Sequence, residues 1–134
     1  MRRLPDVRFF VYSRAWRDDR IRPVLEQMAE LSSCRMWYSI DKGTGPPSNV
    51  PPRVRLAWLM TDDADLPPAG TGLVFRIRRL RRQPRQDVRG VRVCPAEDGQ
   101  PRATRVTCDH CGLCWQPLPE EKGPRISLPL IGPS

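Results

Sequence analysis

The sequence predicts an α/β fold built around a partial parallel sheet with one βαβ crossover. Three observations lead to this prediction. First, a strand-like segment, an amphipathic helical segment and a second strand-like segment follow one another within about 35 residues near the N-terminus. Second, further β-rich segments follow, separated by proline-rich loops. Third, a cysteine-rich loop closes the predicted fold near its C-terminus.

The first strand is predicted over Val7–Ser13 and the second over Arg35–Ile40, because both segments are rich in β-forming residues. Between them, apolar residues recur at the spacing of one helix face. These residues are Ile21, Val24, Leu25, Met28 and Leu31. Strands joined by a helical crossover run parallel, so we expect the two strands to be parallel neighbours, with the apolar stripe facing the sheet.

Three more strands are expected further along the chain, over Arg53–Met60, Leu73–Ile77 and Val88–Val93. We divide the chain into an α/β half-domain over residues 1–93, a cysteine metal-binding loop over 94–116 and an irregular, proline-rich tail over 117–134. Proline cannot donate to a sheet ladder and interrupts helices, which is why the tail is expected to be irregular.

Large apolar side chains occupy both alternations of the predicted strands, which is typical of a sheet buried on both faces. A single helix can cover only one face. We therefore expect a half-domain, a possible half barrel, completed either by a missing N-terminal half-domain or by a second copy in a homodimer. On the isolated chain, Trp, Tyr and Leu side chains would then form an exposed patch.

The four clustered cysteines are the most distinctive feature of the sequence. Cys108, Cys111 and Cys114 have the spacing C-x2-C-x2-C, and Cys94 lies 14 positions before the first of them. Thiolates are soft ligands, and four of them complete either a tetrahedral zinc shell or the iron corners of a 4Fe-4S cluster. The triad has the spacing of bacterial ferredoxins, but two opposed C-x2-C pairs, as in zinc ribbons, are absent. The sequence leaves both cofactors open.

Two neighbouring residues have alternative interpretations. His110 lies inside the cysteine loop and could replace one thiolate at a zinc site, although a histidine in such a loop is more often exposed to solvent. Cys34 stands alone and is expected to be a buried apolar residue.

Charge suggests a second kind of partner. The net charge is +8, and 21 of the 23 basic residues are arginine. Six of these arginines crowd one ten-residue window: Arg76, Arg78, Arg79, Arg81, Arg82 and Arg85. Such a band favours nucleic acid. The alternative interpretations are a solvated arginine-rich hairpin and a codon bias that enriches arginine and proline together.

No apolar run reaches the length of a secretory signal or a membrane span, so a cytoplasmic protein with no membrane partner is expected. Thiols stay reduced there, which favours metal binding over disulfides. The single histidine leaves no plausible nucleophilic triad, and we do not expect the chain to be an active enzyme by itself. The first hypothesis is a metal- or iron–sulfur-binding accessory protein, or a remnant of a larger redox enzyme. The alternative is a zinc-stabilised nucleic-acid-binding protein that uses the arginine band.

Several segments together resemble a known family. They are Val11–Trp16, Trp37–Asp41, Val54–Ala57, Val93–Pro95 and Cys108–Trp115. This succession resembles the C-terminal half of the phage gene product 88-like proteins, a family of unknown function borne by phages and plasmids. That family is in turn similar to radical S-adenosylmethionine barrels, whose N-terminal half carries its own cysteine triad. The resemblance implies a half barrel with an auxiliary-type cluster and no radical chemistry of its own.

Overall fold

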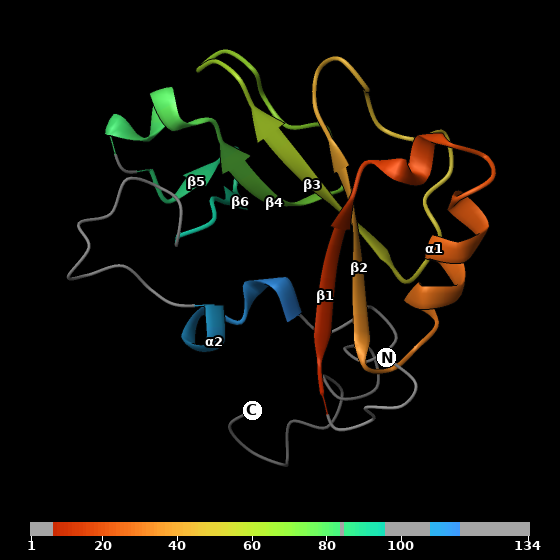
Figure 1. Cartoon of the computed structure of the whole chain (residues 1–134). Coiled ribbons are helices and arrows are strands. Elements are labelled where there is room, and N and C mark those ends of the chain that lie inside the picture. Colours follow the sequence, from red (N-terminus) through yellow and green to blue (C-terminus); the bar gives the residue numbers. More distant parts are fainter. Residues whose placement is uncertain (1–6, 84, 96–107, 116–134) are drawn as a thin grey trace, which may run out of the picture.

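The centre of the protein is a four-stranded parallel sheet, seen in a computed structural model that describes residues 7–83, 85–95 and 108–115 (Figure 1). The strands are β1 (Phe9–Ser13), β2 (Cys34–Ile40), β3 (Val54–Met60) and β4 (Thr71–Arg76). Their order in the sheet, β1-β2-β3-β4, follows the chain, and every neighbouring pair is parallel. The predicted α/β class and the parallel pairing of the first two strands are confirmed.

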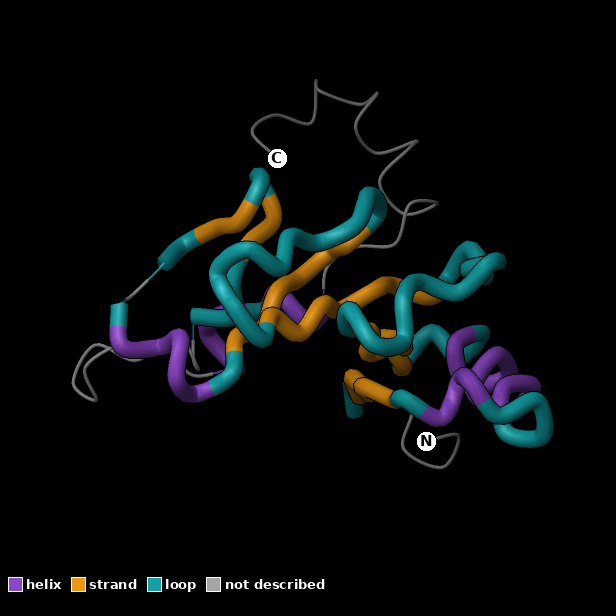
Figure 2. Tube along the Cα trace, turned by 90° about the horizontal axis from the view of Figure 1, so that it is seen from above, coloured by secondary structure: helices purple, strands orange, loops and turns teal. Residues whose placement is uncertain are grey.

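One face of the sheet carries the larger core. Strict alternation along each strand places side chains such as Met36, Tyr38 and Trp58 on this face, where they are almost completely buried. Trp16, from a short 3-10 helix over Ala15–Arg17, stacks on Tyr38 with ring centroids 5.8 Å apart. Helix α1 (Arg22–Ala29) covers the same face beside it (Figures 1 and 2).

Helix α1 buries a narrower stripe than the sequence predicts. Leu25 and Ala29 are buried and Met28 packs against the core, but Ile21 and Val24 are 41% and 53% exposed. The expectation that all five apolar residues face the sheet is therefore wrong for these two, and Leu31 lies beyond the end of the helix at Ala29. The helix has only eight residues and begins after Ile21, which acts as its N-cap. Trp16 fills the neighbouring part of the same core, so only the turn of α1 that carries Leu25, Met28 and Ala29 packs against the sheet.

The predicted fifth strand over Val88–Val93 is instead a short antiparallel hairpin, formed by β5 (Asp87–Val88) and β6 (Val91–Arg92). Arg89 and Gly90 turn it with positive φ angles of 53° and 81°. After the hairpin, Val93 makes a parallel bridge with Val74 of β4. This bridge brings the chain to the free edge of β4, directly before Cys94.

The expected exposed patch of Trp, Tyr and Leu is not found among residues 7–83, 85–95 and 108–115. Trp16, Trp37 and Trp58 are each at most 6% exposed, and the exposed large apolar residues are Val7, Phe10, Ile21, Val24 and Leu66. Trp37, Ala57 and Leu73 form a second small core on the face opposite α1, and residues of the cysteine loop pack against it. Within the same ranges, no helix has the length and apolar character needed to cross a bilayer.

Candidate metal centre

The cysteines reach one region of the molecule from two separate segments. Cys94 follows the hairpin at the edge of β4, and its backbone N–H donates to the carbonyl of Val74 over 2.8 Å. Cys108 and Cys111 begin and end α2 (Cys108–Cys111), a single helical turn. Cys114 lies in the 3-10 turn that follows, over Leu113–Trp115.

Gly112 allows the chain to turn between the second and the third loop cysteine. Its φ of 66° reverses the chain between α2 and the 3-10 turn, in the left-handed region that other residues avoid. Without this reversal the helix would continue and carry Cys114 away from the sheet.

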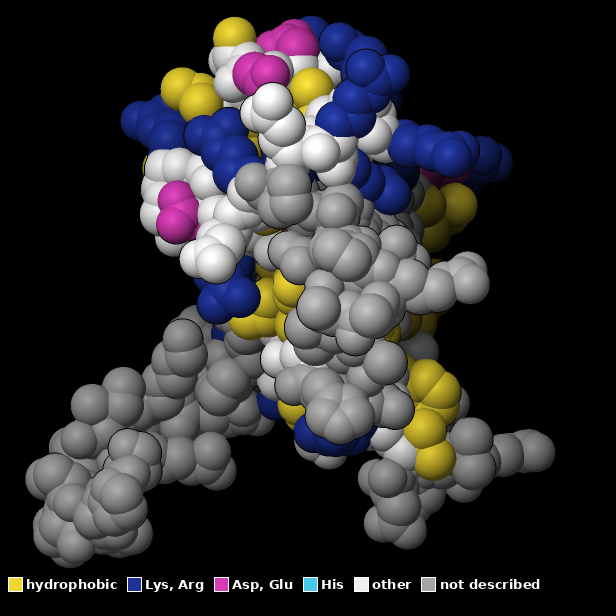
Figure 3. Space-filling model, turned by 90° about the vertical axis from the view of Figure 1, so that its left-hand side faces the viewer, with side chains coloured by type: hydrophobic (Ala, Val, Ile, Leu, Met, Phe, Trp, Pro, Cys, Tyr) yellow, Lys and Arg dark blue, Asp and Glu magenta, His cyan; other side chains and the backbone are white. Residues whose placement is uncertain are grey.

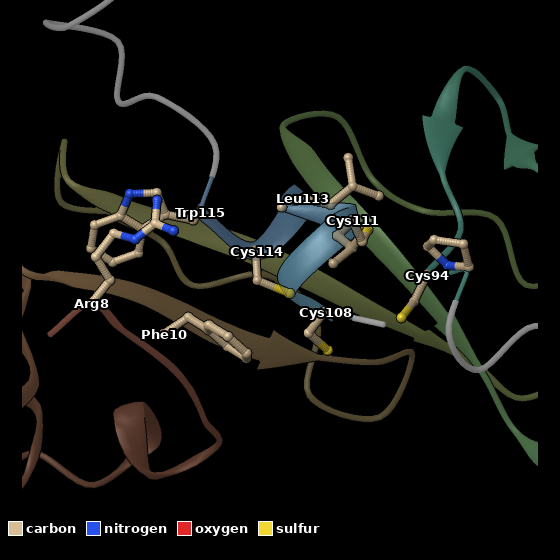
Figure 4. A pocket seen from close by; sticks show the side chains of 11 residues that line it. Arg8, Phe10, Cys94, Cys108, Cys111, Leu113, Cys114 and Trp115 are labelled. Atoms are coloured by element: carbon tan, nitrogen blue, oxygen red, sulfur yellow. The ribbon is translucent and has the colours of Figure 1, made fainter. Parts of the chain in front are cut away.

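All four cysteines line the same cavity, which has a volume of about 310 Å³ (Figure 4). Phe10 and Leu73 of the sheet form part of its wall, and Arg8 and Trp115 lie at one side. Figure 4 shows Cys94 entering from the side of the cavity opposite Cys114. Within the described ranges, no three Cys, His, Asp or Glu side chains converge closely enough to hold a metal ion as they stand.

Two side chains of the sheet hold the loop through Cys114. The Tyr12 hydroxyl donates to Cys114 Sγ over 2.7 Å, and the Trp37 indole N–H donates to the Cys114 carbonyl over 3.0 Å. The two rings are stacked on each other with centroids 5.5 Å apart. The loop is therefore fixed at its last cysteine by one contact to the sulfur and one to the backbone.

The next residue adds a third attachment. The Trp115 ring faces two guanidinium groups: that of Arg35 lies 4.2 Å from the ring centroid and that of Arg8 lies 5.3 Å away. At these distances the attraction between a cation and the face of an indole contributes about 0.5–2 kcal/mol. Arg35 lies on β2 and Arg8 directly before β1, so this contact anchors the loop to two adjacent strands.

The surroundings keep Tyr12 protonated. Burial is the largest cause that raises the pKa of its hydroxyl far above the ordinary value. The hydrogen bond to Cys114 raises it further, followed by the negative charge that Cys114, Cys94 and Cys108 would carry as thiolates. The phenol thus remains a hydrogen-bond donor toward the sulfurs over the whole physiological pH range.

The cavity continues into an apolar hollow over the carboxyl-terminal half of the same sheet face. Tyr12, Leu59 and Phe75 line this hollow, and Cys94, Cys108 and Cys114 border it as well. Cys94, Cys108 and Cys114 thus lie between the cysteine cavity and this apolar hollow, and they line both. Cys108 is exposed to solvent, whereas Cys94 is only 8% exposed.

The remaining candidate residues are distributed as follows. His110 lies in α2, but its side chain is outside the described part of the chain. Cys34 is 1% exposed at the start of β2, and burial raises the pKa of its thiol. Its expected role as a buried apolar residue fits this position.

The arginine band does not form a hairpin, which was one of its alternative interpretations. Residues Arg78–Arg82 form a 3-10 helix directly after β4. Four of the six arginines line one hollow there: Arg76, Arg79, Arg82 and Arg85. Arg81 is turned back, and its Nε–H donates to the carbonyl of Arg76 over 2.7 Å.

Sequence reasoning missed the residues that attach the cysteine loop, namely Tyr12, Trp37, Arg35 and Arg8. The structure places Tyr12 and Trp37 side by side on the sheet face opposite α1. Strand alternation separates the two faces of one strand, but it does not indicate which face the helix covers. Their partners lie 102 and 77 residues away, at a separation that no local pattern reveals.

Comparison with known proteins gives one match. The family model described as Gene product 88 matches residues 1–117, which is most of the chain. No curated protein and no solved structure matches. The matched range includes the whole sheet and all four cysteines of the cavity.

Proposed function

The chain belongs to the gene product 88 family, a phage family, and from the cysteine cavity we propose that it binds a 4Fe-4S cluster through Cys94, Cys108, Cys111 and Cys114. The observation that carries the proposal is that all four thiols, from segments 14 residues apart, line one cavity against the sheet. Four cysteines are the usual ligand set of such a cluster.

The volume of the cavity favours a cluster over a single zinc ion. Zinc binds each sulfur at about 2.3 Å, which places tetrahedral ligand sulfurs roughly 3.8 Å apart. The described side chains do not converge to that extent. A cubane cluster takes each sulfur at a different iron, so its ligands stand farther apart around a larger body. The 310 Å³ cavity that the four cysteines line has room for such a body.

The chain's own residues would orient the ligands and restrict water. Tyr12 donates a hydrogen bond to Cys114 Sγ, and contacts of this kind favour the negatively charged state of a ligand sulfur. Phe10 and Leu73 provide apolar walls, and Trp37 holds the loop backbone against the sheet. A bound cluster would supply one-electron transfer.

We assign the chain an accessory role, as an electron-transferring partner or a remnant of a larger redox enzyme. The exposed position of Cys108 and the apolar hollow beside three ligands would let a partner approach the cluster closely. A likeness to the C-terminal half of a radical S-adenosylmethionine barrel remains part of this proposal. It is supported by the open parallel sheet with cysteines on one face, and it predicts that a second half-domain or a second copy covers the hollow.

The test is anaerobic purification followed by iron, sulfide and zinc analysis. We expect a brown protein that absorbs near 400 nm, with about four irons and four sulfides per chain. Cys94→Ala and Cys111→Ala should each lose most of the bound iron. Cys34→Ala is the matched control, because this cysteine is buried outside the cavity and should retain the full cluster.

A colourless protein with one zinc per chain would overturn the choice of cluster but keep the four-cysteine centre. Loss of iron from Cys34→Ala equal to that from Cys94→Ala would show that the thiols act through folding and not as ligands. A protein with no bound metal after anaerobic reconstitution with iron and sulfide would overturn the proposal as a whole.

A further inference from the structure

A second site is suggested by the arginine-lined hollow at the carboxyl end of β4. Arg76 is the last residue of β4, and the 3-10 helix Arg78–Arg82 starts two residues later. In a 3-10 helix, side chains three residues apart lie directly above one another. Arg79 and Arg82 have this spacing, so the helix presents both guanidinium groups on one side.

The hollow has a volume of about 530 Å³ and is open to solvent. Arg76, Arg79, Arg82 and Arg85 line it, and Asp63 is the one acidic side chain among its described lining residues. Four positive charges and one negative charge give a local excess of three. A concentration of charge in a concave surface produces a stronger field than the same charges spread over a convex one.

Several contacts to backbone carbonyls preorganise the lining. Arg76 is only 3% exposed, and its Nη2 donates to the Gln83 carbonyl over 2.7 Å. Arg79 Nη2 donates to the Thr61 carbonyl over 2.8 Å, and Arg85 Nε donates to the Asp87 carbonyl over 3.0 Å. Each of these carbonyl acceptors fixes the direction of a guanidinium group. The side chains therefore lose little further freedom when an anion binds.

Further arginines extend the positive surface beyond the hollow. Arg78 on the 3-10 helix and Arg89 and Arg92 on the hairpin are exposed, and these elements lie at the same end of the molecule (Figure 1). Figure 3 shows lysine and arginine side chains gathered over the upper part of this face. The surface is larger than one phosphate group requires, which favours a polymer of phosphates over a small phosphorylated molecule.

We propose that this surface binds the phosphate backbone of duplex DNA without reading its sequence. No aromatic residue is among the described residues of the hollow, so it lacks the stacking platform that single strands use. Arginine forks match phosphate geometry, and contacts to the backbone carry no sequence information. In the described part of the chain, the hollow shares only β4 with the cysteine cavity, through Arg76 on one side and Leu73 on the other, and it does not depend on a bound metal.

The test is fluorescence anisotropy of the purified full chain with a labelled duplex of about 20 base pairs, measured over a range of salt concentrations. Non-specific binding of this kind has a dissociation constant of about 1–100 μM near physiological salt. The double variant Arg79→Gln with Arg82→Gln should bind about tenfold more weakly. It should also lower the slope of log K against log salt by about two, one for each lost phosphate contact.

The matched control is Arg17→Gln with Arg20→Gln, which removes the same charge from exposed positions beside α1. It should leave the salt slope nearly unchanged. Equal weakening by the two double variants would overturn the proposal, because net charge alone would then explain binding. Tighter binding of single strands, or displacement of the duplex by 1 mM pyrophosphate as complete as by excess unlabelled duplex, would also overturn it. Because Arg82 is exposed, Arg82→Glu alone serves as a second variant if the double variant is unstable.

Discussion

Replacing Trp37 by phenylalanine tests whether the sheet holds the cysteine loop. Trp37 is 0% exposed, and its indole N–H donates to the Cys114 carbonyl over 3.0 Å. Phenylalanine can still stack on Tyr12, but it loses the hydrogen bond and leaves a void. The lost hydrogen bond is worth about 1 kcal/mol. The void adds roughly 1–2 kcal/mol, which is less than the 3–5 kcal/mol of a complete truncation to alanine.

We therefore expect the free energy of unfolding to fall by about 2–3 kcal/mol, which lowers Tm by roughly 8–12 °C in a domain of this size. The distinguishing result concerns the loop. In chelator-treated protein, iodoacetamide should modify Cys114 faster in Trp37→Phe than in the unchanged chain, because the loop is released from the sheet. Thermal unfolding by circular dichroism and peptide mass spectrometry measure the two effects.

Trp16→Phe is the control for this experiment. Trp16 is also buried, at 6% exposed, and its indole N–H also donates to a backbone carbonyl, that of Ser39, over 2.9 Å. It lies on the α1 face and does not contact the loop. Both variants should lose similar stability, but only Trp37→Phe should change the labelling of Cys114. Equal labelling of Cys114 in the two variants would refute the attachment.

Three further results are expected. Tyr12→Phe removes the donor to Cys114 Sγ and should lower the reduction potential of a bound cluster by roughly 40 mV, the equivalent of about 1 kcal/mol for one electron, in a voltammetric titration. The hydrogen bond from Arg14, followed by backbone N–H donors, holds the pKa of Asp41 below its ordinary value of 3.8, so the carboxylate stabilises the fold at neutral pH and ceases to do so as pH falls through that lowered pKa. The difference in urea midpoint between Asp41→Asn and the unchanged chain should accordingly shrink as pH is lowered from 7 toward 3. Gly72→Val should lower the free energy of unfolding, measured by thermal unfolding, by about 1–3 kcal/mol, because a Cβ at this position would lie 3.1 Å from the buried indole of Trp37.

Two ion pairs connect the carboxyl ends of neighbouring strands in the sheet. Arg14 and Asp41 approach to 2.7 Å, and Lys42 and Asp62 approach to 3.0 Å. Polar groups that follow β1, β2 and β3 therefore meet at one edge of the sheet. However, the charges pair with each other across neighbouring strand ends, and at exposed positions each pair contributes at most about 1 kcal/mol. The two pairs link the ends of β1, β2 and β3, and their charges compensate each other.

The sequence by itself determined the parallel α/β core and the set of candidate ligands. Alternation along β2 and β3, the helical spacing of Leu25 and Met28, and the close spacing of the cysteines are all local patterns. A local pattern is readable because the period of a strand or helix, or the reach of a loop, depends only on nearby residues. For the same reason, the extent of the helical stripe was overestimated, since the exposure of Ile21 and Val24 depends on where Trp16 packs.

Only the tertiary structure decided what covers the second face and which arginines act together. Tyr12 and Trp37 meet Cys114 across most of the chain, and Cys94 joins the loop cysteines only because Val93 pairs with the free edge of β4. Likewise, the sequence shows six clustered arginines, but only the structure shows which four of them line one hollow, because the 3-10 helix sets the directions of their side chains. These contacts depend on how separate segments pack in space, and the energies that select one packing come from burial and hydrogen bonds between residues far apart in the sequence.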